Sequence, residues 1–354
     1  MKIAVVGGGI IGAVAALRLA RDHQVTLIDP NDATGRTTDG SLAWLNVCTT
    51  ADPSYARLRK AALDLWHDML RDDPEMPVSI TGSLIWGDTA ADTHARADLT
   101  RSIGWQAEVL DAKGFARMAP GFANPPAQAL YAPDEGRADP QGIVRWAKAK
   151  AQALGAGTVQ ARVASILAKG GQVTGVTLAD GQHLSADAVV IAAGHGSAAL
   201  LAPLGIDLPV NRKPGFVLRT APLPPVGTAV HGSEVLDCWQ GPDGRVLMAS
   251  SLAKTGSDAL DLATSDALVA LRRMYPDLDP KVETVIQRDR PIPSDGVSLV
   301  GGLDMPGLYT AVTHSGVTLA PVMAETLAQE IATGAPLPVA APYTPLRSAE
   351  RKAS

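Results

Sequence analysis

Three glycines and one aspartate near the amino terminus have the types and spacing that bind a dinucleotide. Gly7, Gly9 and Gly12 follow the apolar run that opens the chain, and Asp29 closes the next apolar run. In this pattern the first glycine permits a tight turn, the second lets the backbone approach a pyrophosphate, and the third lets the next helix pack against the strand. A helix over 11–20 would point free N–H groups at the phosphates, and Asp29 would accept hydrogen bonds from ribose hydroxyls. The alternative is a tight turn in an unrelated α/β protein.

The composition is that of a globular protein with about two domains. The chain has 354 residues, of which 46% are hydrophobic and 19% charged. A net charge of −5 without a basic stripe argues against a nucleic-acid partner. Two cysteines make no disulfide framework, and no apolar run is long enough to span a membrane. We therefore expect a cytoplasmic protein without a membrane span, and we find no spacing typical of metal ligands.

The elements that must position these residues alternate between strands and helices. Asp52 and Pro53 are typical of a helix start, and apolar residues then recur at helical spacing through Met69. Further helices are expected over 91–103, 141–154, 257–274 and 321–331. Strands are expected over 78–80, 82–86, 158–166, 173–178, 187–193, 215–219 and 246–249, and the tail after Gly334 is expected to be draped over the surface or partly loose.

Four further segments resemble a known family. Residues 187–194 (DAVVIAAG) resemble the third-strand motif of flavoproteins with the glutathione-reductase-type FAD fold. Residues 290–296 (RPIPSDG) and 308–321 (LYTAVTHSGVTLAP) resemble the carboxy-terminal motifs of the D-amino-acid oxidase, glycine oxidase and sarcosine oxidase superfamily, and 137–140 (RADP) resembles the opening of its second half. The loop after residue 313 is two residues shorter than the common family wording.

This resemblance implies an α/β fold in two parts. A Rossmann-like FAD-binding domain would comprise residues 1–75, 131–208 and 288–340. A substrate domain built on an antiparallel sheet would comprise 76–130 and 209–287, and 341–354 would form a tail.

The family chemistry implied by the resemblance is oxidation of the C–N bond of an amino acid or a related secondary amine. A hydride would pass to flavin N5, and water would hydrolyse the resulting imine. Oxygen or another electron acceptor would reoxidise the flavin. Related enzymes can tether flavin through a carboxy-terminal cysteine, but Cys48 and Cys238 lie outside that region, so we expect non-covalent FAD.

The resemblance also implies the cofactor contacts, which come from both ends of the chain. Asp29 would hold the adenosine ribose, Val163 would flank the adenine, and the loop from His314 to Thr318 would meet the flavin ring. The full set is Gly7, Gly9, Ile10, Ile11, Gly12, Asp29, Pro30, Thr38, Ser41, Val163, Ala193, Gly194, His314, Ser315, Gly316, Val317 and Thr318.

Arg290 and His314 are the candidate catalytic residues. The planar fork of Arg290 suits a substrate carboxylate, although pairing with Asp289 or Asp295 would be a structural alternative. His314 is expected beside the flavin, as a cofactor contact, a catalytic group or a loop cap. Five further candidates for the substrate pocket are Trp44, Asn46, Lys213, His231 and Trp239, with packing or a solvated strand end as the alternative.

Two other functions fit parts of the pattern. The amino-terminal glycine motif alone also fits an NAD(P)-dependent dehydrogenase. A flavin-binding subunit of a larger dehydrogenase, without turnover of its own, would share every motif of an active oxidoreductase.

Overall fold

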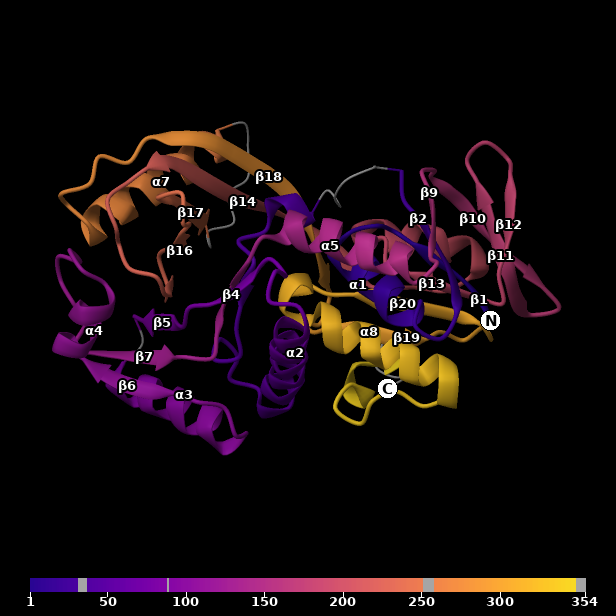
Figure 1. The fold of residues 1–354 in the computed structure, drawn as a ribbon, viewed down its shortest axis with the longest axis horizontal. Helices are drawn as coiled ribbons and strands as arrows, with labels where there is room; N and C mark the ends of the chain where they lie inside the picture. Colours follow the sequence, from indigo (N-terminus) through magenta and orange to yellow (C-terminus); the bar gives the residue numbers. More distant parts are fainter. Residues whose placement is uncertain (31–36, 88, 251–257, 348–354) are drawn as a thin grey trace.

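A computed structural model describes residues 1–30, 37–87, 89–250 and 258–347. Its two lobes lie side by side in Figure 1. The lobe that holds the amino terminus is built on a six-stranded sheet with the order β19 (Leu299–Gly302), β20 (Leu308–Val312), β13 (Ala188–Ile191), β1 (Lys2–Val6), β2 (Gln24–Ile28) and β9 (Gly157–Val159). All neighbouring pairs are parallel except β19 and β20. The α/β fold predicted from the sequence is confirmed.

Both faces of this sheet are covered, because β1 is apolar on both sides. Ile3 and Val5 belong to the core formed with helices α1 (Ile10–Leu19), α5 (Pro140–Ala153) and α8 (Gly316–Thr333). Ala4 and Val6 belong to a second core, under a three-stranded sheet made of β10 (Val163–Lys169), β11 (Gln172–Leu178) and β12 (His183–Ser185). Alternate strand residues point to opposite faces, so a fully apolar strand fits a sheet buried on both sides.

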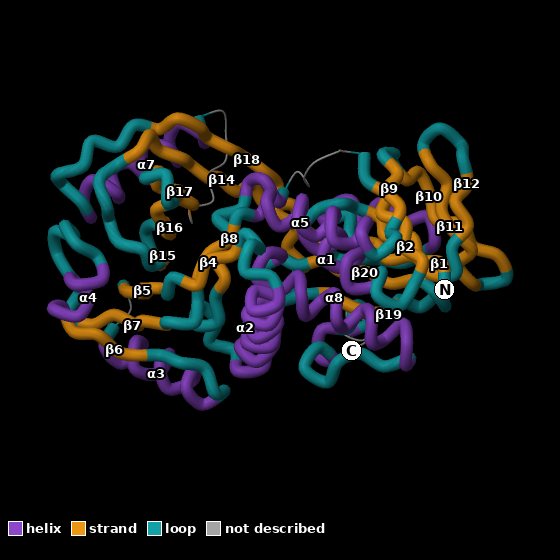
Figure 2. Tube along the Cα trace, viewed as in Figure 1, coloured by secondary structure: helices purple, strands orange, loops and turns teal. Residues whose placement is uncertain are grey.

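The second lobe is built on an eight-stranded sheet. Its order is β18 (Val282–Pro293), β14 (Val210–Pro222), β17 (Arg245–Ser250), β16 (Asp237–Gln240), β15 (Val230–Ser233), β5 (Ser83–Trp86), β7 (Gln128–Ala132) and β6 (Glu108–Asp111). The pairing is antiparallel except between β15 and β5. Helices α3 (Ala90–Ser102), α4 (Ala112–Met118) and α7 (Ala259–Met274) pack on it, and strands and helices are distinguished by colour in Figure 2.

Short elements connect the two lobes. A small sheet is formed by β3 (Trp44–Leu45), β8 (Gly136–Ala138) and β4 (Val78–Ile80), and β8 and β4 are labelled above α2 (Pro53–Asp72) in Figure 2. The side chain of Asp52 accepts from the first-turn N–H of Ser54 at 2.8 Å, so α2 begins where its cap predicts. Helix α6 (Ser197–Leu201) follows β13. We propose the division into an FAD-binding domain and a substrate domain given above. The predicted boundary at residue 288 falls within β18, so this strand contributes to both domains.

The predicted strand over 158–166 is two strands in the structure. β9 extends the six-stranded sheet, and β10 starts the three-stranded sheet after a break of three residues. Local apolar pattern does not show which sheet a strand joins, because that depends on pairing with distant residues.

Helix α8 begins at Gly316, five residues before the predicted start at Pro321, which lies inside the helix. Proline has no N–H to donate to the carbonyl oxygen of Val317 four residues earlier. The indole Nε1 of Trp66 donates to the carbonyl oxygens of Val317 and Thr318, each at 3.1 Å. A side chain from α2 therefore replaces the missing helix bond.

The described part of the predicted tail is packed against the protein. Tyr343 is 3% exposed and contacts Tyr55 edge-on, with ring centroids 5.5 Å apart. Arg347 forms an ion pair with Asp295 at 3.1 Å. Residues 348–354, and the expected helix start at Ser257, lie outside the described residues.

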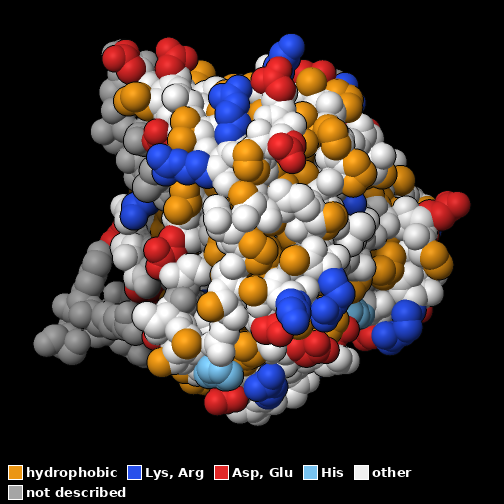
Figure 3. Space-filling model, turned by 90° about the vertical axis from the view of Figure 1, so that its left-hand side faces the viewer, with side chains coloured by type: hydrophobic (Ala, Val, Ile, Leu, Met, Phe, Trp, Pro, Cys, Tyr) orange, Lys and Arg blue, Asp and Glu red, His pale blue; other side chains and the backbone are white. Residues whose placement is uncertain are grey.

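The surface of the second lobe mixes charges of both signs. Figure 3 shows acidic and basic side chains close together on this end of the molecule. Some form ion pairs across neighbouring strands, such as Arg245 with Glu283 at 2.8 Å. Among the helices in the described ranges, none combines the length and the apolar character needed to cross a bilayer.

Candidate active site

One cavity of about 770 Å³ connects the two lobes. Its wall contains the glycine turn after β1, loop residues between 37 and 49, the start of β10 and the turn after β13. On the side of the second lobe it contains residues of β14, β16, β17 and β18, and residues 312–318 close it. It lies at the carboxyl end of β1, between β2 and β13, where the strand order of a parallel sheet reverses. That switch point is where α/β sheets bind ligands.

The glycine turn brings bare backbone to the cavity. Gly7 has a φ of +106°, and a Cβ there would lie 2.5 Å from the carbonyl oxygen of Ala192. A Cβ at Gly12 would collide with the carbonyl oxygen of Gly7, so α1 packs directly on its preceding strand. Gly9, at the cap position of α1, has no side chain to cap the first turn, and this end of the helix lines the cavity, where its dipole favours an anion. These features fit the diphosphate of FAD.

Asp29 and Thr38 lie beside this turn. The carboxylate of Asp29 accepts a hydrogen bond from the N–H of Gly8, and the side chain is 6% exposed. Thr38 Oγ1 accepts from the N–H of Ile10 at 3.2 Å. Pro30, Ser41, Val163, Ala193 and Gly194, all predicted cofactor contacts, also line the cavity, as does His195.

We expect Asp29→Ala to lower FAD affinity, because it removes both the predicted ribose acceptor and the bond that holds the glycine turn. A charged hydrogen bond of this kind is worth about 1.5–3 kcal/mol, or a factor of ten or more. Fluorescence titration of the apoprotein with FAD checks this. Unchanged FAD affinity would show that the ribose is held elsewhere.

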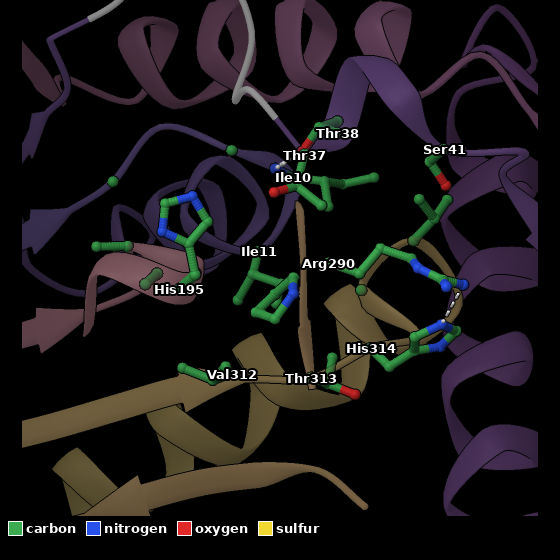
Figure 4. A pocket seen from close by; sticks show the side chains of 18 of the residues that line it. Ile10, Ile11, Thr37, Thr38, Ser41, His195, Arg290, Val312, Thr313 and His314 are labelled. Carbon is green, nitrogen blue, oxygen red and sulfur yellow. Dashed lines mark hydrogen bonds between the residues drawn. The ribbon is translucent and has the colours of Figure 1, made fainter. Parts of the chain in front are cut away.

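Arg290 extends from β18 into the opposite end of the cavity, beside His314 (Figure 4). Its Nη1 lies 3.3 Å from His314 Nε2, and its Nη2 donates to the carbonyl oxygen of Pro214 at 3.2 Å. Gly215 leaves room for it, because a Cβ there would lie 2.8 Å from Arg290 Nε. Asp295, one of the two expected alternative partners, instead forms the ion pair with Arg347. Within the described ranges Arg290 has no carboxylate partner.

His314 is held in its neutral form. Burial, and then the nearby charges of Arg290, Arg59 and Lys213, lower its pKa to about 4. Because a guanidinium only donates, His314 Nε2 must accept the bond from Arg290, and the ring proton is then on Nδ1. His314 therefore orients Arg290 and, in this arrangement, does not offer Nε2 as a base.

Arg59, which is not among the predicted site residues, also lines the cavity and is 8% exposed. Its Nη2 donates to Ser315 Oγ at 2.7 Å, and its Nη1 donates to the backbone and side-chain oxygens of Asn46. The signal was present, because Arg59 stands one turn after Tyr55, in the buried stripe of α2. Asn46, a predicted substrate contact, lines the cavity, and its side-chain oxygen accepts a hydrogen bond from Arg59.

Trp44, a predicted substrate contact, lines the cavity, and its neighbour Ala43 has an unusual backbone conformation. Ala43 has a φ of +56°, the only positive value for a non-glycine residue among those described. Such conformations cost energy and concentrate at functional sites. The indole Nε1 of Trp44 donates to Ser83 Oγ at 2.7 Å, which fixes the ring orientation.

Four predicted residues are not part of the cavity wall: Gly12, Lys213, His231 and Trp239. Gly12 acts through helix packing. Lys213 is exposed on β14, opposite Arg290. Trp239 donates from Nε1 to the carbonyl oxygen of Leu42 at 2.7 Å and lies under the guanidinium of Arg137, so it supports a cavity loop from behind.

His231 lies in an aromatic core and not in the substrate pocket as predicted. It is 1% exposed, stacks on Tyr275 with ring centroids 6.1 Å apart, and contacts Trp86 edge-on. These partners come from distant segments, so local sequence does not reveal the cluster. Burial lowers the pKa of His231 to about 4.

The burial of His231 predicts that the folded protein is less stable at acidic pH. His231 stays neutral in the folded protein below its ordinary pKa of 6.5, whereas the unfolded chain takes up a proton. The free energy of unfolding therefore falls as pH drops from 6.5 towards 4, by about 2–3 kcal/mol from this residue at about pH 4.5. Urea unfolding at about pH 7 and about pH 4.5 measures this. The free energy of unfolding should fall less between the two pH values in His231→Gln than in the original protein. An equal drop in both proteins would contradict the assignment.

Both cysteines are buried, and neither lines the cavity. Burial raises the pKa of Cys48 and raises that of Cys238 to about 12, so both remain thiols. This supports the proposal that FAD is held without a covalent bond.

The fold and the cavity are those of a dinucleotide-binding protein, and comparison with known proteins identifies the family. Residues 2–330 match the model of the FAD dependent oxidoreductase family, so the chain belongs to that family and uses FAD. It is 29% identical to D-amino acid dehydrogenase 2 of Ralstonia nicotianae, over 97% of this chain and 99% of that protein. It is also 29% identical to glycine oxidase of Pseudomonas putida, over 97% and 98%.

A solved structure with the same fold is the L-proline dehydrogenase from P. horikoshii. The TM-score is 0.89 at 19% identity, with 99% of this chain and 98% of that chain covered. The chain is therefore an FAD-dependent oxidoreductase by its family, and it shares its fold with this solved structure.

Proposed function

We propose that this enzyme oxidises the C–N bond of an α-amino acid or an N-substituted amino acid that binds through its carboxylate. The observation that carries the proposal is the partly buried guanidinium of Arg290. It has no carboxylate partner within the described ranges and lies in the same cavity as the FAD cradle. A positive charge that the protein leaves uncompensated inside a cavity favours an anionic ligand there.

Arg290 is arranged to bind and orient such a substrate. His314 and the carbonyl oxygen of Pro214 fix the direction of its guanidinium. A carboxylate bound to the guanidinium of Arg290 cannot rotate freely. The carbon that carries the amine is therefore held in one orientation in the cavity. Restriction of this kind supplies a large part of enzymatic rate enhancement.

The cofactor is held by residues from both ends of the chain. We assign the glycine turn, Asp29 and Thr38 to its nucleotide half, and residues 314–318 to its ring. When bound, the flavin supplies the chemistry by accepting a hydride from the carbon that carries the amine. The amino terminus of α8, capped by Ser315, also faces the cavity, and its dipole favours negative charge there.

No protein base is required if the amine arrives uncharged. His314 Nε2 accepts a hydrogen bond from Arg290, so we assign His314 to positioning Arg290 and contacting the cofactor. The apolar lining, with Val217 on strand β14, excludes water from the reacting carbon.

A substrate panel tests the proposal. FAD-loaded protein is mixed with D- and L-amino acids and their N-methyl derivatives, with oxygen consumption and reduction of an added dye as parallel readouts. At least one carboxylate-bearing amine should be oxidised, and the responding readout identifies oxygen or another acceptor. Protein that keeps FAD but oxidises no member would instead favour a non-catalytic flavin subunit.

A further inference from the structure

The cavity also contains a carboxylate that the proposed reaction does not use. Asp237 on β16 lines the same cavity as Arg290. Its Oδ1 accepts one long hydrogen bond, 3.3 Å, from the N–H of Ser233. Burial raises the pKa of Asp237 to about 6, and this single N–H works against the rise. Over the described ranges no lysine, arginine or histidine is within ion-pair distance of it.

The sheet register places Asp237 at a distance from Arg290. Asp237 pairs with Ala249, and Ala249 pairs with Val217, so these three side chains share one face of the sheet. Gly215, which lies under Arg290, is on the same face two residues before Val217. Gly215 lies two strands away from Asp237 across the sheet and two residues further along its own strand. With ordinary strand geometry their backbones are roughly 12 Å apart. The guanidinium bends further away, towards Pro214 and His314.

An aromatic ring lies beside the Asp237 carboxylate. The register of β15 against β16 puts Gly232 opposite Asp237. Gly232 has no side chain, and the six-membered ring of Trp44 fills that space on the face that Asp237 shares. A carboxylate next to an indole is a combination that attracts a cationic nitrogen, through a charged hydrogen bond and through the ring face.

We propose that Asp237 and Trp44 form a subsite for a cationic nitrogen of the substrate, opposite the carboxylate held at Arg290. The inference rests on the proposed function, because it names a second recognition element in the same site. The separation favours a nitrogen on the substrate side chain over the α-nitrogen, which is only two bonds from the carboxylate. The preferred substrates are then amino acids with a basic side chain.

Binding of unreactive or slow ligands tests this without relying on turnover. Calorimetry on the FAD-loaded protein compares pentanoate with 5-aminopentanoate, which differ by a remote nitrogen, and acetate with glycine, which differ by an α-nitrogen. The amino group should improve binding of the longer ligand by about tenfold or more, the value of a hydrogen bond to a charged group. Asp237→Asn should abolish that gain while keeping the bond from Ser233.

The outcomes are distinct. If Asp237→Asn loses the affinity gained from the amino group only between pentanoate and 5-aminopentanoate, the result supports a subsite for the side-chain nitrogen. If the variant loses the gain between acetate and glycine, Asp237 binds the α-nitrogen and the proposed side-chain subsite is wrong. An unchanged gain in both pairs, or no gain in the original protein, overturns the proposal. Asp243→Asn is the matched control, because Asp243 lies in the hairpin between β16 and β17 and pairs with Arg219 at 2.6 Å, outside the cavity wall. The two proposals fail separately. If the ligands bind as expected but no amine is oxidised, the proposed function is wrong and the binding result still supports the subsite.

Discussion

Replacing Arg290 by alanine should weaken carboxylate binding by at least tenfold and leave FAD retention almost unchanged. The guanidinium is a positive group in the cavity, and it has no acidic partner among the described residues. A hydrogen bond to a charged group is worth about 1.5–3 kcal/mol, and each 1.4 kcal/mol is a factor of ten. Flavin absorbance after gel filtration reports FAD retention, and titration with a carboxylate ligand reports binding.

Two further variants make this result specific. Arg290→Lys keeps the charge but loses the planar fork, so it should recover only part of the binding. Arg219→Ala, on the neighbouring strand β14 and paired with Asp243 outside the cavity wall, should change neither quantity. If Arg290→Ala lost flavin and carboxylate to the same extent, Arg290 would be structural.

Gly12→Val should strongly weaken the binding of FAD. A Cβ at Gly12 would meet the carbonyl oxygen of Gly7, which belongs to rigid backbone, so α1 must move away from β1. Overpacking of this kind costs about 1–3 kcal/mol or more. Here the displaced backbone is also the predicted diphosphate cradle. We expect FAD affinity to fall by about a hundredfold, measured by fluorescence titration of apoprotein whose circular dichroism matches the original.

Gly157→Ala is the matched control for this substitution. Gly157 lies in β9 of the same sheet, has no positive φ, and has no neighbour closer than 3.9 Å to an added Cβ. It should bind FAD as the original protein does. Full FAD affinity in Gly12→Val would refute the assigned role of the glycine turn.

Local signals in the sequence were enough for the cofactor end of the site. The glycine spacing and Asp29 lie within one strand-helix-strand unit, so their structure depends on near neighbours. The Asp52 cap likewise marks the start of α2. The start of α8 could not be predicted, because Trp66 from another helix compensates for Pro321.

The substrate end depends on contacts between distant segments. Arg290, Trp44 and Asp237 come from three strands in two different sheets, and only the packing of the folded chain brings them to one cavity. His231 was misplaced because its partners, Trp86 and Tyr275, are far away in the chain. Arg59 was hidden because a basic residue within an apolar helix stripe is easily taken for a surface residue.

We propose that a substrate C–N bond is oxidised by two electrons in this cavity. A single turnover in the absence of oxygen tests this most directly. FAD-loaded protein is mixed with the best amino acid of the panel, and the loss of flavin absorbance and the products are measured together. The account predicts one 2-oxo acid or aldehyde and one ammonia or amine for each flavin reduced, with no reduction by the same compound lacking its nitrogen. Flavin that stays oxidised with every amino acid, or that is reduced without release of a nitrogen compound, would contradict it.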